Sequence, residues 1–237
     1  LTQAQHSKID RLLDGLNLNS GSHLLEIGTG WGELAKRAAE RFGCRVTSVT
    51  ISREQLEYAR EKIARAGLEQ LVSIEFRDYR DLCGEYDAIV SVEMIEAVGR
   101  AYLNSFLVKC SQLLKRGGRF ALQAITITDR KYEEYCRSED WIQRRIFPGG
   151  HLPSLGHLQE IIDSRLPMTT KDTYHMGKSY AETLRRWGER FFSNIAAVRN
   201  LGFDDRFIRT WEYYLCYCEV GFDTELIDDV QILLEKS

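Results

Sequence analysis

The sequence predicts an α/β domain whose mainly parallel, seven-stranded sheet carries helices on both faces. Short apolar runs alternate with helical patterns along the first half of the 237-residue chain. The runs are apolar almost throughout, as expected for strands that are buried on both faces. The first run passes into a helix through a glycine-rich turn, and this order is typical of an open α/β sheet.

Each element follows from its apolar pattern in chain order. Amphipathic periodicity predicts helices at residues 4–15, 31–42, 53–66 and 102–114. Apolar runs predict strands at residues 24–28, 45–50, 72–76, 87–92 and 119–126. The basic segment 115–119 is interpreted as a helix end with a glycine turn before the last of these strands.

The pattern changes in the second half. Residues 129–165 contain no strand pattern, and a sixth strand is expected at 168–175. Two helical patterns follow, over residues 180–198 and 207–218, before a closing strand at 226–234. We expect one domain over 1–237, with a cofactor-binding half at 1–126. Residues 129–222 form an acceptor-side insertion and helices that act as a lid over the sheet edge.

Composition excludes several functional classes. The net charge of −3 gives no reason to expect a nucleic-acid partner. No apolar run approaches the roughly 18 residues of a membrane span. The six cysteines form no C-x-x-C pair and no zinc-like cluster with histidine, so we expect no metal site. Free thiols indicate a reducing, cytoplasmic compartment.

The glycine-rich turn identifies the cofactor class. A dinucleotide fingerprint needs a glycine at the position of Glu33 and an acid at the end of strand 45–50, and both are missing. The pattern E-x-G-x-G-x-G, from Glu26 to Gly32, instead resembles motif I of the class I S-adenosylmethionine-dependent methyltransferases, which have a Rossmann-like fold. The alternative is a tight strand–helix turn that holds no ligand.

Five further blocks extend the resemblance over nearly the whole chain. They are DYRDL (78–82), SVEMIEAVG (91–99), IFPGGHLPS (146–154), SYAETLRRW (179–187) and CEVGFDTELIDDVQ (218–231). Together they resemble the cyclopropane-fatty-acyl-phospholipid synthases and the mycolic acid cyclopropane synthases. The resemblance implies methyl transfer from S-adenosylmethionine to a cis double bond of a phospholipid acyl chain, followed by proton loss that closes a ring.

The resemblance also implies which residues bind the cofactor. Gln55 matches a ribose contact, although Ser52-x-x-Gln55 is equally a helix capping box. Asp78 is expected to accept from the adenine amine, with the Tyr79 ring against the base. The full expected set is Glu26, Gly28, Thr29, Gly30, Gly32, Thr50, Ser52, Gln55, Asp78, Tyr79 and Glu93.

Catalytic roles come from the same resemblance. Glu96 matches a carboxylate that holds a bicarbonate ion, the base that removes the proton. Tyr180 supplies a hydroxyl to that ion, and Ile125 supplies backbone. The alternatives are solvated acids at a helix start for Glu93 and Glu96, and a core aromatic for Tyr180. Glu93 stands where many relatives carry glycine.

Two departures concern bicarbonate. Gln123 replaces the usual histidine, so the ion is expected to bind more loosely, or the proton to leave from another carbon and give a branched chain. Glutamine can donate to an anion but cannot carry a proton. The family also has a Tyr-Ser-Cys block just before AQHSKID (4–10), and its cysteine helps bind bicarbonate. The sequence begins after that point, at Leu1.

Substrate and partners are expectations of the same kind. We expect an unsaturated phospholipid at a membrane surface, reached by peripheral association, and a homodimer is left open. Aromatic side chains are candidates for an acyl channel, although such stripes are commonly core: Trp141, Phe147, Trp187, Phe191, Trp211 and Tyr214. The alternatives are a methyl- or methylene-branched product on the same lipid, methylation of a soluble small molecule, and cofactor binding without catalysis.

Overall fold

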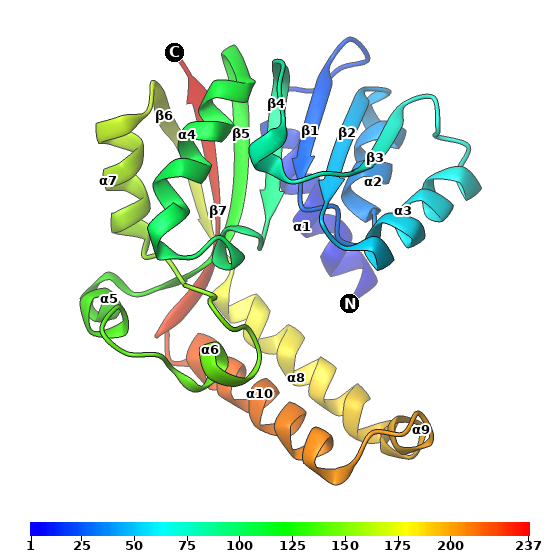
Figure 1. Ribbon diagram of the computed structural model, residues 1–237, viewed down its shortest axis with the longest axis vertical. Coiled ribbons are helices and arrows are strands. Elements are labelled where there is room, and N and C mark those ends of the chain that lie inside the picture. Colours follow the sequence, from blue (N-terminus) through cyan, green and yellow to red (C-terminus); the bar gives the residue numbers. More distant parts are fainter.

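The computed structural model describes residues 1–237 and contains one seven-stranded sheet (Figure 1). The strand order is β3-β2-β1-β4-β5-β7-β6. The strands are β1 (His23–Ile27), β2 (Arg45–Thr50), β3 (Val72–Phe76), β4 (Tyr86–Val92), β5 (Leu114–Ile127), β6 (Met168–His175) and β7 (Ile227–Lys236). This confirms the predicted sheet.

Helices connect the strands and cover the sheet. Those of the first half are α1 (Thr2–Gly15), α2 (Glu33–Phe42), α3 (Arg53–Arg65) and α4 (Leu103–Leu113). Those of the second half are α5 (Asp129–Tyr135), α6 (Trp141–Arg145), α7 (Leu155–Arg165), α8 (Gly177–Ser193), α9 (Ile195–Asn200) and α10 (Asp205–Asp223). Short 3₁₀ turns are η1 (Tyr79–Asp81), η2 (Ile95–Ala97) and η3 (Arg100–Tyr102). None of these helices is long and apolar enough to span a bilayer.

Strand direction places the site at one edge of the sheet. β1 pairs in parallel with β2 and β4, β2 with β3, and β4 with β5. β7 runs antiparallel to both β5 and β6. The carboxyl ends of the five parallel strands therefore lie together, and that edge is where open α/β sheets bind ligands.

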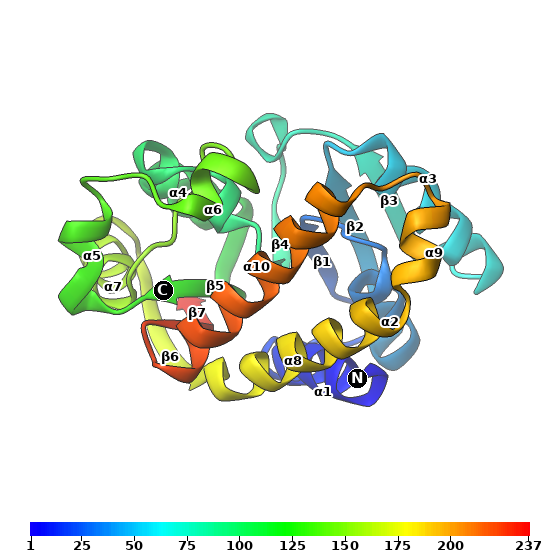
Figure 2. The same cartoon turned by 90° about the horizontal axis from the view of Figure 1, so that it is seen from below.

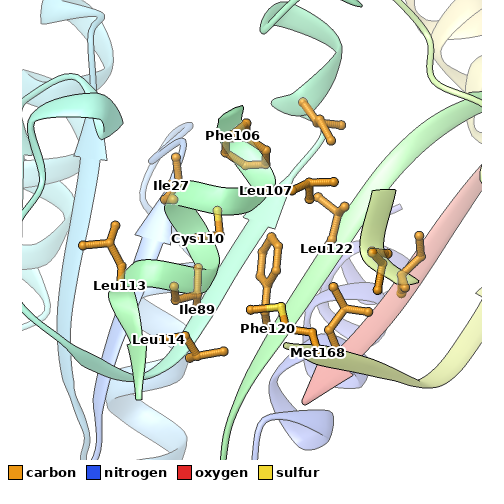
Figure 3. Close-up of a cluster of buried hydrophobic side chains, with 14 of the residues drawn as sticks. Ile27, Ile89, Phe106, Leu107, Cys110, Leu113, Leu114, Phe120, Leu122 and Met168 are labelled. Carbon is orange, nitrogen blue, oxygen red and sulfur yellow. The ribbon is translucent and has the colours of Figure 1, made fainter. Parts of the chain in front are cut away.

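Alternate strand residues enter two separate cores, one on each face. Leu24, Val46 and Val90 pack with α1, α2 and α3. Leu25 and Ile89 face α4 and α7 on the other side. Figure 3 shows part of this second core, in which Phe106, Leu107 and Cys110 of α4 lie against side chains of β4 and β5. Burial on both faces explains the nearly continuous apolar runs.

The helices α8 and α10 form a pair that projects from the sheet (Figure 1). They pack on each other through Ala181, Leu184, Leu215 and Phe222. Seen from that end in Figure 2, the pair extends from the β6–β7 side toward α2 and α3.

Two sequence predictions are corrected. Segment 115–119 is not a helix end, because α4 stops at Leu113 and β5 already begins at Leu114. Its glycines form a bulge in which Gly117 has φ 71° and a Cβ on Gly118 would lie 2.8 Å from the Asp87 carbonyl. The helix expected over 180–198 breaks at Asn194, whose side-chain amide donates to the Arg190 carbonyl at 2.7 Å.

Candidate active site

The glycine turn after β1 is shaped by backbone conformations that favour glycine. Gly28, Gly30 and Gly32 have φ values of 97°, 51° and 76°. A Cβ on Gly32 would meet Ala59 of α3 at 2.9 Å, whereas one on Gly30 would have nothing within 4 Å. The Gly30 and Trp31 N–H groups have no hydrogen-bond partner within the chain. The turn thus leaves an open space lined by free donors just before a helix N-terminus, and such a place suits a polar ligand.

Glu26 supports the turn from below. Its carboxyl group is buried and accepts from the Ser48 hydroxyl, which lies 2.8 Å from the Thr29 hydroxyl. Burial raises the pKa of Glu26 to about 8, partly opposed by the Ser48 hydrogen bond. Glu26 and Thr29 are therefore structural supports of the turn.

The end of β2 is joined to the start of α3. Ser52 accepts from the Gln55 backbone N–H at 3.2 Å, which is the first half of the predicted capping box. The second half, a hydrogen bond from the Ser52 N–H to the Gln55 side chain, is absent. The Gln55 side chain accepts instead from the Thr50 hydroxyl at 2.8 Å, and the Ser52 N–H donates to the Thr50 hydroxyl at 3.1 Å. Thr50, Ser52 and Gln55 form one polar corner beside the glycine turn.

Asp78 and Tyr79 follow β3, at the next carboxyl end along the sheet. The Asp78 carboxylate accepts from the Arg80 N–H at 2.9 Å and pairs with its guanidinium at 2.6 Å. The Arg80 hydrogen bond holds the pKa of Asp78 below its ordinary value. The Tyr79 ring meets Phe106 edge-on, with 5.2 Å between centroids. An adenine contact stays a prediction for both residues.

Glu93 lies at the end of β4 in a left-handed conformation, with φ 48°. A non-glycine residue with this φ is uncommon, so the backbone here favours glycine. The conformation is held by the backbone N–H of Glu93 bonded to the Gln123 carbonyl at 2.9 Å. Its carboxylate accepts from Gln123 Nε2 at 2.8 Å and Tyr180 Oη at 2.7 Å, and pairs with Lys8 Nζ at 3.3 Å.

Glu96 lies one turn further, in η2. Its Oε1 accepts from the Ile125 backbone N–H at 2.5 Å, and its Oε2 is buried with no hydrogen-bond partner. Burial raises the pKa of Glu96 to about 7, against the opposing hydrogen bond from Ile125. One oxygen is thus fixed by a hydrogen bond, and the other is buried without a partner.

Gln123, in the middle of the sheet, is fully buried and fully hydrogen-bonded. Its Nε2 also donates to Asp229 Oδ2 at 2.9 Å, and its Oε1 accepts from Gln231 Nε2 at 3.0 Å. Asp229 and Gln231 come from the antiparallel neighbour β7. Burial raises the pKa of Asp229 to about 9, and the nearby Glu93 charge adds to this effect.

Tyr180 connects this group to the helix pair. Its ring stacks on Phe222 of α10 at 4.6 Å and meets Trp187 at 6.3 Å. The ring centroids of Phe147 and Trp211 lie 6.3 and 5.3 Å from the ring centroid of Tyr214. Tyr180 is therefore both a core aromatic and a polar contact, and an aromatic surface continues from it.

Two other features border this group. A cavity of about 470 Å³ lies between the end of β5 and the start of α8, lined by residues such as Ile127, Met176 and Phe222. It contains neither the glycine turn nor Glu96. His151 is buried, with its Nε2 3.1 Å from the Tyr132 hydroxyl, and its backbone N–H donates to the Glu96 carbonyl at 2.8 Å.

Sequence reasoning placed Glu93, Glu96, Gln123, Ile125 and Tyr180 in one site. The structure hydrogen-bonds Glu93 to Gln123 and Tyr180, and binds Glu96 separately to the Ile125 N–H. Sequence reasoning missed Lys8, Asp229 and Gln231. Asp229 carried a signal, because a charged residue interrupts an apolar pattern in a strand expected to be buried. Lys8 gave none, since a lysine on an amphipathic helix is ordinary.

The sheet order, the glycine turn and the polar corners at the strand ends define a class I methyltransferase fold. The model of the family described as mycolic acid cyclopropane synthetase matches residues 1–232, and the chain belongs to this family.

The most similar curated relatives and solved structures include members of the same family. The chain is 46% identical to the tuberculostearic acid methyltransferase UfaA1 of Mycobacterium tuberculosis over 98% of its length and 54% of the relative. It is 34% identical to the cyclopropane-fatty-acyl-phospholipid synthase of Escherichia coli K12 over 100% of its length and 59% of the relative. The chain thus spans little more than half of these relatives.

Among solved structures, the mycolic acid cyclopropane synthase CmaA1 complexed with SAH and CTAB superposes with a TM-score of 0.91 at 27% identity, covering 99% of this chain and 85% of that one. The cyclopropane synthase MmaA2 from Mycobacterium tuberculosis gives a TM-score of 0.90 at 25% identity, covering 100% and 85%.

Proposed function

We propose that the protein transfers the methyl group of S-adenosylmethionine to the cis double bond of a phospholipid acyl chain. The observation that carries the proposal is the adjacency of two groups of residues at one edge of the sheet. The glycine turn with its free N–H groups follows β1, and the buried carboxyl group of Glu96 follows the neighbouring strand β4.

The glycine turn fits S-adenosylmethionine. Gly30 leaves open space, and the free N–H groups of Gly30 and Trp31 can bind a polar part of the cofactor. Thr50, Gln55 and Asp78 offer hydroxyl, amide and carboxylate groups for the ribose and the base. When bound, the cofactor supplies a methyl group on a positively charged sulfur. Support comes from CmaA1, whose structure holds SAH.

The acceptor side suits an alkene. An alkene has no acidic proton, so no base is needed before the methyl group is added. The addition leaves a carbocation, which aromatic faces stabilise and which water would quench. The ring of Tyr180, whose hydroxyl binds Glu93, lies beside the carboxyl groups, and Trp187 meets that ring edge-on. Access to the acyl chain requires peripheral contact of the protein with a membrane.

The product is a ring or a branched chain, depending on which proton is lost. The family model and the Escherichia coli relative favour the ring. Two observations favour a branched chain. Gln123 replaces the histidine, and the relative with 46% identity is named as a tuberculostearic acid methyltransferase and not as a cyclopropane synthase. We favour the branched product and keep the cyclopropane ring as the second candidate.

The experiment uses S-adenosylmethionine labelled with ¹³C in the methyl group and vesicles of cis-unsaturated phospholipid. Carbon NMR of the extracted lipid reports where the label resides. A methyl or alkene ¹³C signal shows a branched chain, and a high-field ring methylene shows cyclopropane. A label found only in soluble acceptors supplied alongside, with none in lipid, contradicts the proposal.

A further inference from the structure

The resemblance assigns several hydrogen-bond donors to a bicarbonate ion. In this chain, those donors bind carboxyl groups instead. The Ile125 N–H binds Glu96 at 2.5 Å, and the Tyr180 hydroxyl binds Glu93 at 2.7 Å. Gln123 Nε2 binds Glu93 at 2.8 Å and Asp229 at 2.9 Å. An amide nitrogen has two N–H groups, so Gln123 has none left for an ion.

The orientation of the Gln123 amide is fixed from its other end. Its Oε1 accepts from Gln231 Nε2 at 3.0 Å, and Gln231 Nε2 is also bound to the Lys8 carbonyl at 3.0 Å. A rotated amide would place its oxygen against the carboxyl oxygens of Glu93 and Asp229, and its N–H groups against a donor. Gln123 therefore cannot turn to meet an anion without the loss of several buried hydrogen bonds.

The charge balance also disfavours an added anion. The charges of three neighbouring carboxyl groups, those of Glu93, Glu96 and Asp229, act on one another. These carboxyl groups make one ion pair, between Glu93 and Lys8 Nζ at 3.3 Å. Another negative charge would be brought into a buried place that already holds an excess of acids. The residues present do not fit a bicarbonate ion.

Glu96 offers an alternative acceptor for the proton. Ile125 holds its Oε1, while its Oε2 is shielded from solvent and has no partner in the chain. A general base needs an unoccupied lone pair that is held in place, and Oε2 provides one. The raised pKa of Glu96, about 7, is consistent with this role.

We propose that the Glu96 carboxylate itself accepts the proton in this chain, and that Asp229 is a positioning residue that binds Gln123 and thereby closes the site to bicarbonate. This rests on the proposed function. For a branched chain, a C–H bond on a carbon next to the carbocation breaks, and its electron pair forms the new C=C bond. For a ring, a C–H bond of the added methyl group breaks, and its electron pair forms the C–C bond to the cationic carbon. In either case the proton passes to Glu96 Oε2. Glu96 then releases the proton to water.

The test compares lipid methylation in carbon-dioxide-free buffer with methylation after bicarbonate is added back. The unchanged protein is expected to differ by less than about twofold between the two buffers. Asp229→Leu frees one N–H of Gln123, so its turnover is expected to rise at least about fivefold with bicarbonate. Asp229→Asn is the matched control, because its amide oxygen still accepts from Gln123 and the protein should remain insensitive to bicarbonate.

A second measurement detects the ion without turnover. The NMR line of ¹³C-bicarbonate is expected to broaden with Asp229→Leu and to stay sharp with the unchanged protein and with Asp229→Asn. Glu96→Gln is expected to lose turnover about 100-fold or more in both buffers, while still binding S-adenosylmethionine in calorimetry.

Contrary outcomes separate the two proposals. If the unchanged protein methylates lipid but loses most of its turnover without bicarbonate, the role of Glu96 is overturned and the lipid reaction stands. Broadening of the bicarbonate line by the unchanged protein overturns it as well. If no lipid product forms in either buffer, the proposed function itself is contradicted.

Discussion

The Tyr180 hydroxyl donates a hydrogen bond to Glu93 at 2.7 Å and so ties helix α8 to the end of β4, 87 residues earlier in the chain. The ring of the same tyrosine stacks on Phe222 of α10. One side chain thus connects the aromatic helix pair to the carboxyl groups. Its position couples the acceptor side of the molecule to the residues that would handle the proton.

Removal of the Tyr180 hydroxyl tests this connection. Tyr180→Phe keeps the stacking on Phe222, and Glu93 retains Gln123 and Lys8 as partners. We therefore expect a change of about 1 kcal/mol in the free energy of unfolding, with kcat reduced about tenfold. Steady-state kinetics and thermal unfolding measure both. The exposed Tyr213→Phe is the control, and an equal loss of kcat there would count against a specific role for Tyr180.

Two glycine substitutions separate stability from cofactor binding. Gly32→Ala places a Cβ 2.9 Å from Ala59 and is expected to lower the free energy of unfolding by roughly 2–3 kcal/mol. Gly30→Ala meets no protein atom within 4 Å, so only the left-handed backbone costs about 1–2 kcal/mol.

Calorimetry with S-adenosylmethionine is expected to show a loss of affinity for Gly30→Ala that is larger than its loss of stability. If Gly30→Ala binds the cofactor as tightly as the unchanged protein, the cofactor does not lie against Gly30.

Stability is expected to fall as the pH rises. The folded-state pKa values of Glu26, Glu96 and Asp229 are raised to about 8, 7 and 9. A raised pKa means that the folded protein holds the proton more tightly than the unfolded chain. The stabilisation is complete below the ordinary carboxyl pKa and is lost as the pH rises through these values.

Chemical denaturation between pH 5 and 9 measures this loss. The free energy of unfolding is expected to fall less steeply with pH for Glu26→Gln, which removes one titrating group and keeps a side chain of the same shape. A slope that Glu26→Gln leaves unchanged would show that Glu26 is not protonated in the folded protein.

The rate of methyl transfer is expected to rise with pH, whereas the stability falls. If Glu96 accepts the proton, it must be ionised, so kcat should rise with pH and level off above about 7. The titratable groups that face it are Glu93 and Asp229, whose charges interact with it, and His151, whose backbone N–H donates to the Glu96 carbonyl at 2.8 Å. A pH profile of kcat measured at saturating substrate checks this. A rate that is flat between pH 6 and 8 contradicts the prediction.

Much of the fold could be predicted because local pattern and tertiary structure agree. Strand β1, with Leu24 and Leu25 on opposite faces, reads as apolar because both faces are buried. The bulge at Gly117 could not be predicted, because its cause is the approach of Gly118 to the Asp87 backbone in a neighbouring strand. The break at Asn194 depends on a side-chain hydrogen bond that helical periodicity does not reveal.

The candidate site was likewise predicted only in part from the sequence. Family resemblance assigned Glu96, Gln123 and Tyr180 to one site. The pairing of β4 with β5 explains why Glu93 and Glu96, which follow β4, reach Gln123 and Ile125 of β5. The resemblance did not reveal that Gln123 donates to Asp229, because β7 pairs with β5 only in the folded sheet. Nor did it reveal that Glu93 adopts φ 48° and accepts the Tyr180 hydroxyl.

The most direct test of the central claim uses S-adenosylmethionine with a deuterated methyl group. Vesicles of cis-unsaturated phospholipid are compared with vesicles of the saturated phospholipid of the same chain length and headgroup. Mass spectrometry of the acyl chains is expected to show deuterium in the unsaturated lipid alone, and Glu96→Gln is expected to lower its rate of incorporation about 100-fold or more. Deuterium in both lipids at equal levels, or in neither, would contradict methyl transfer to an acyl double bond.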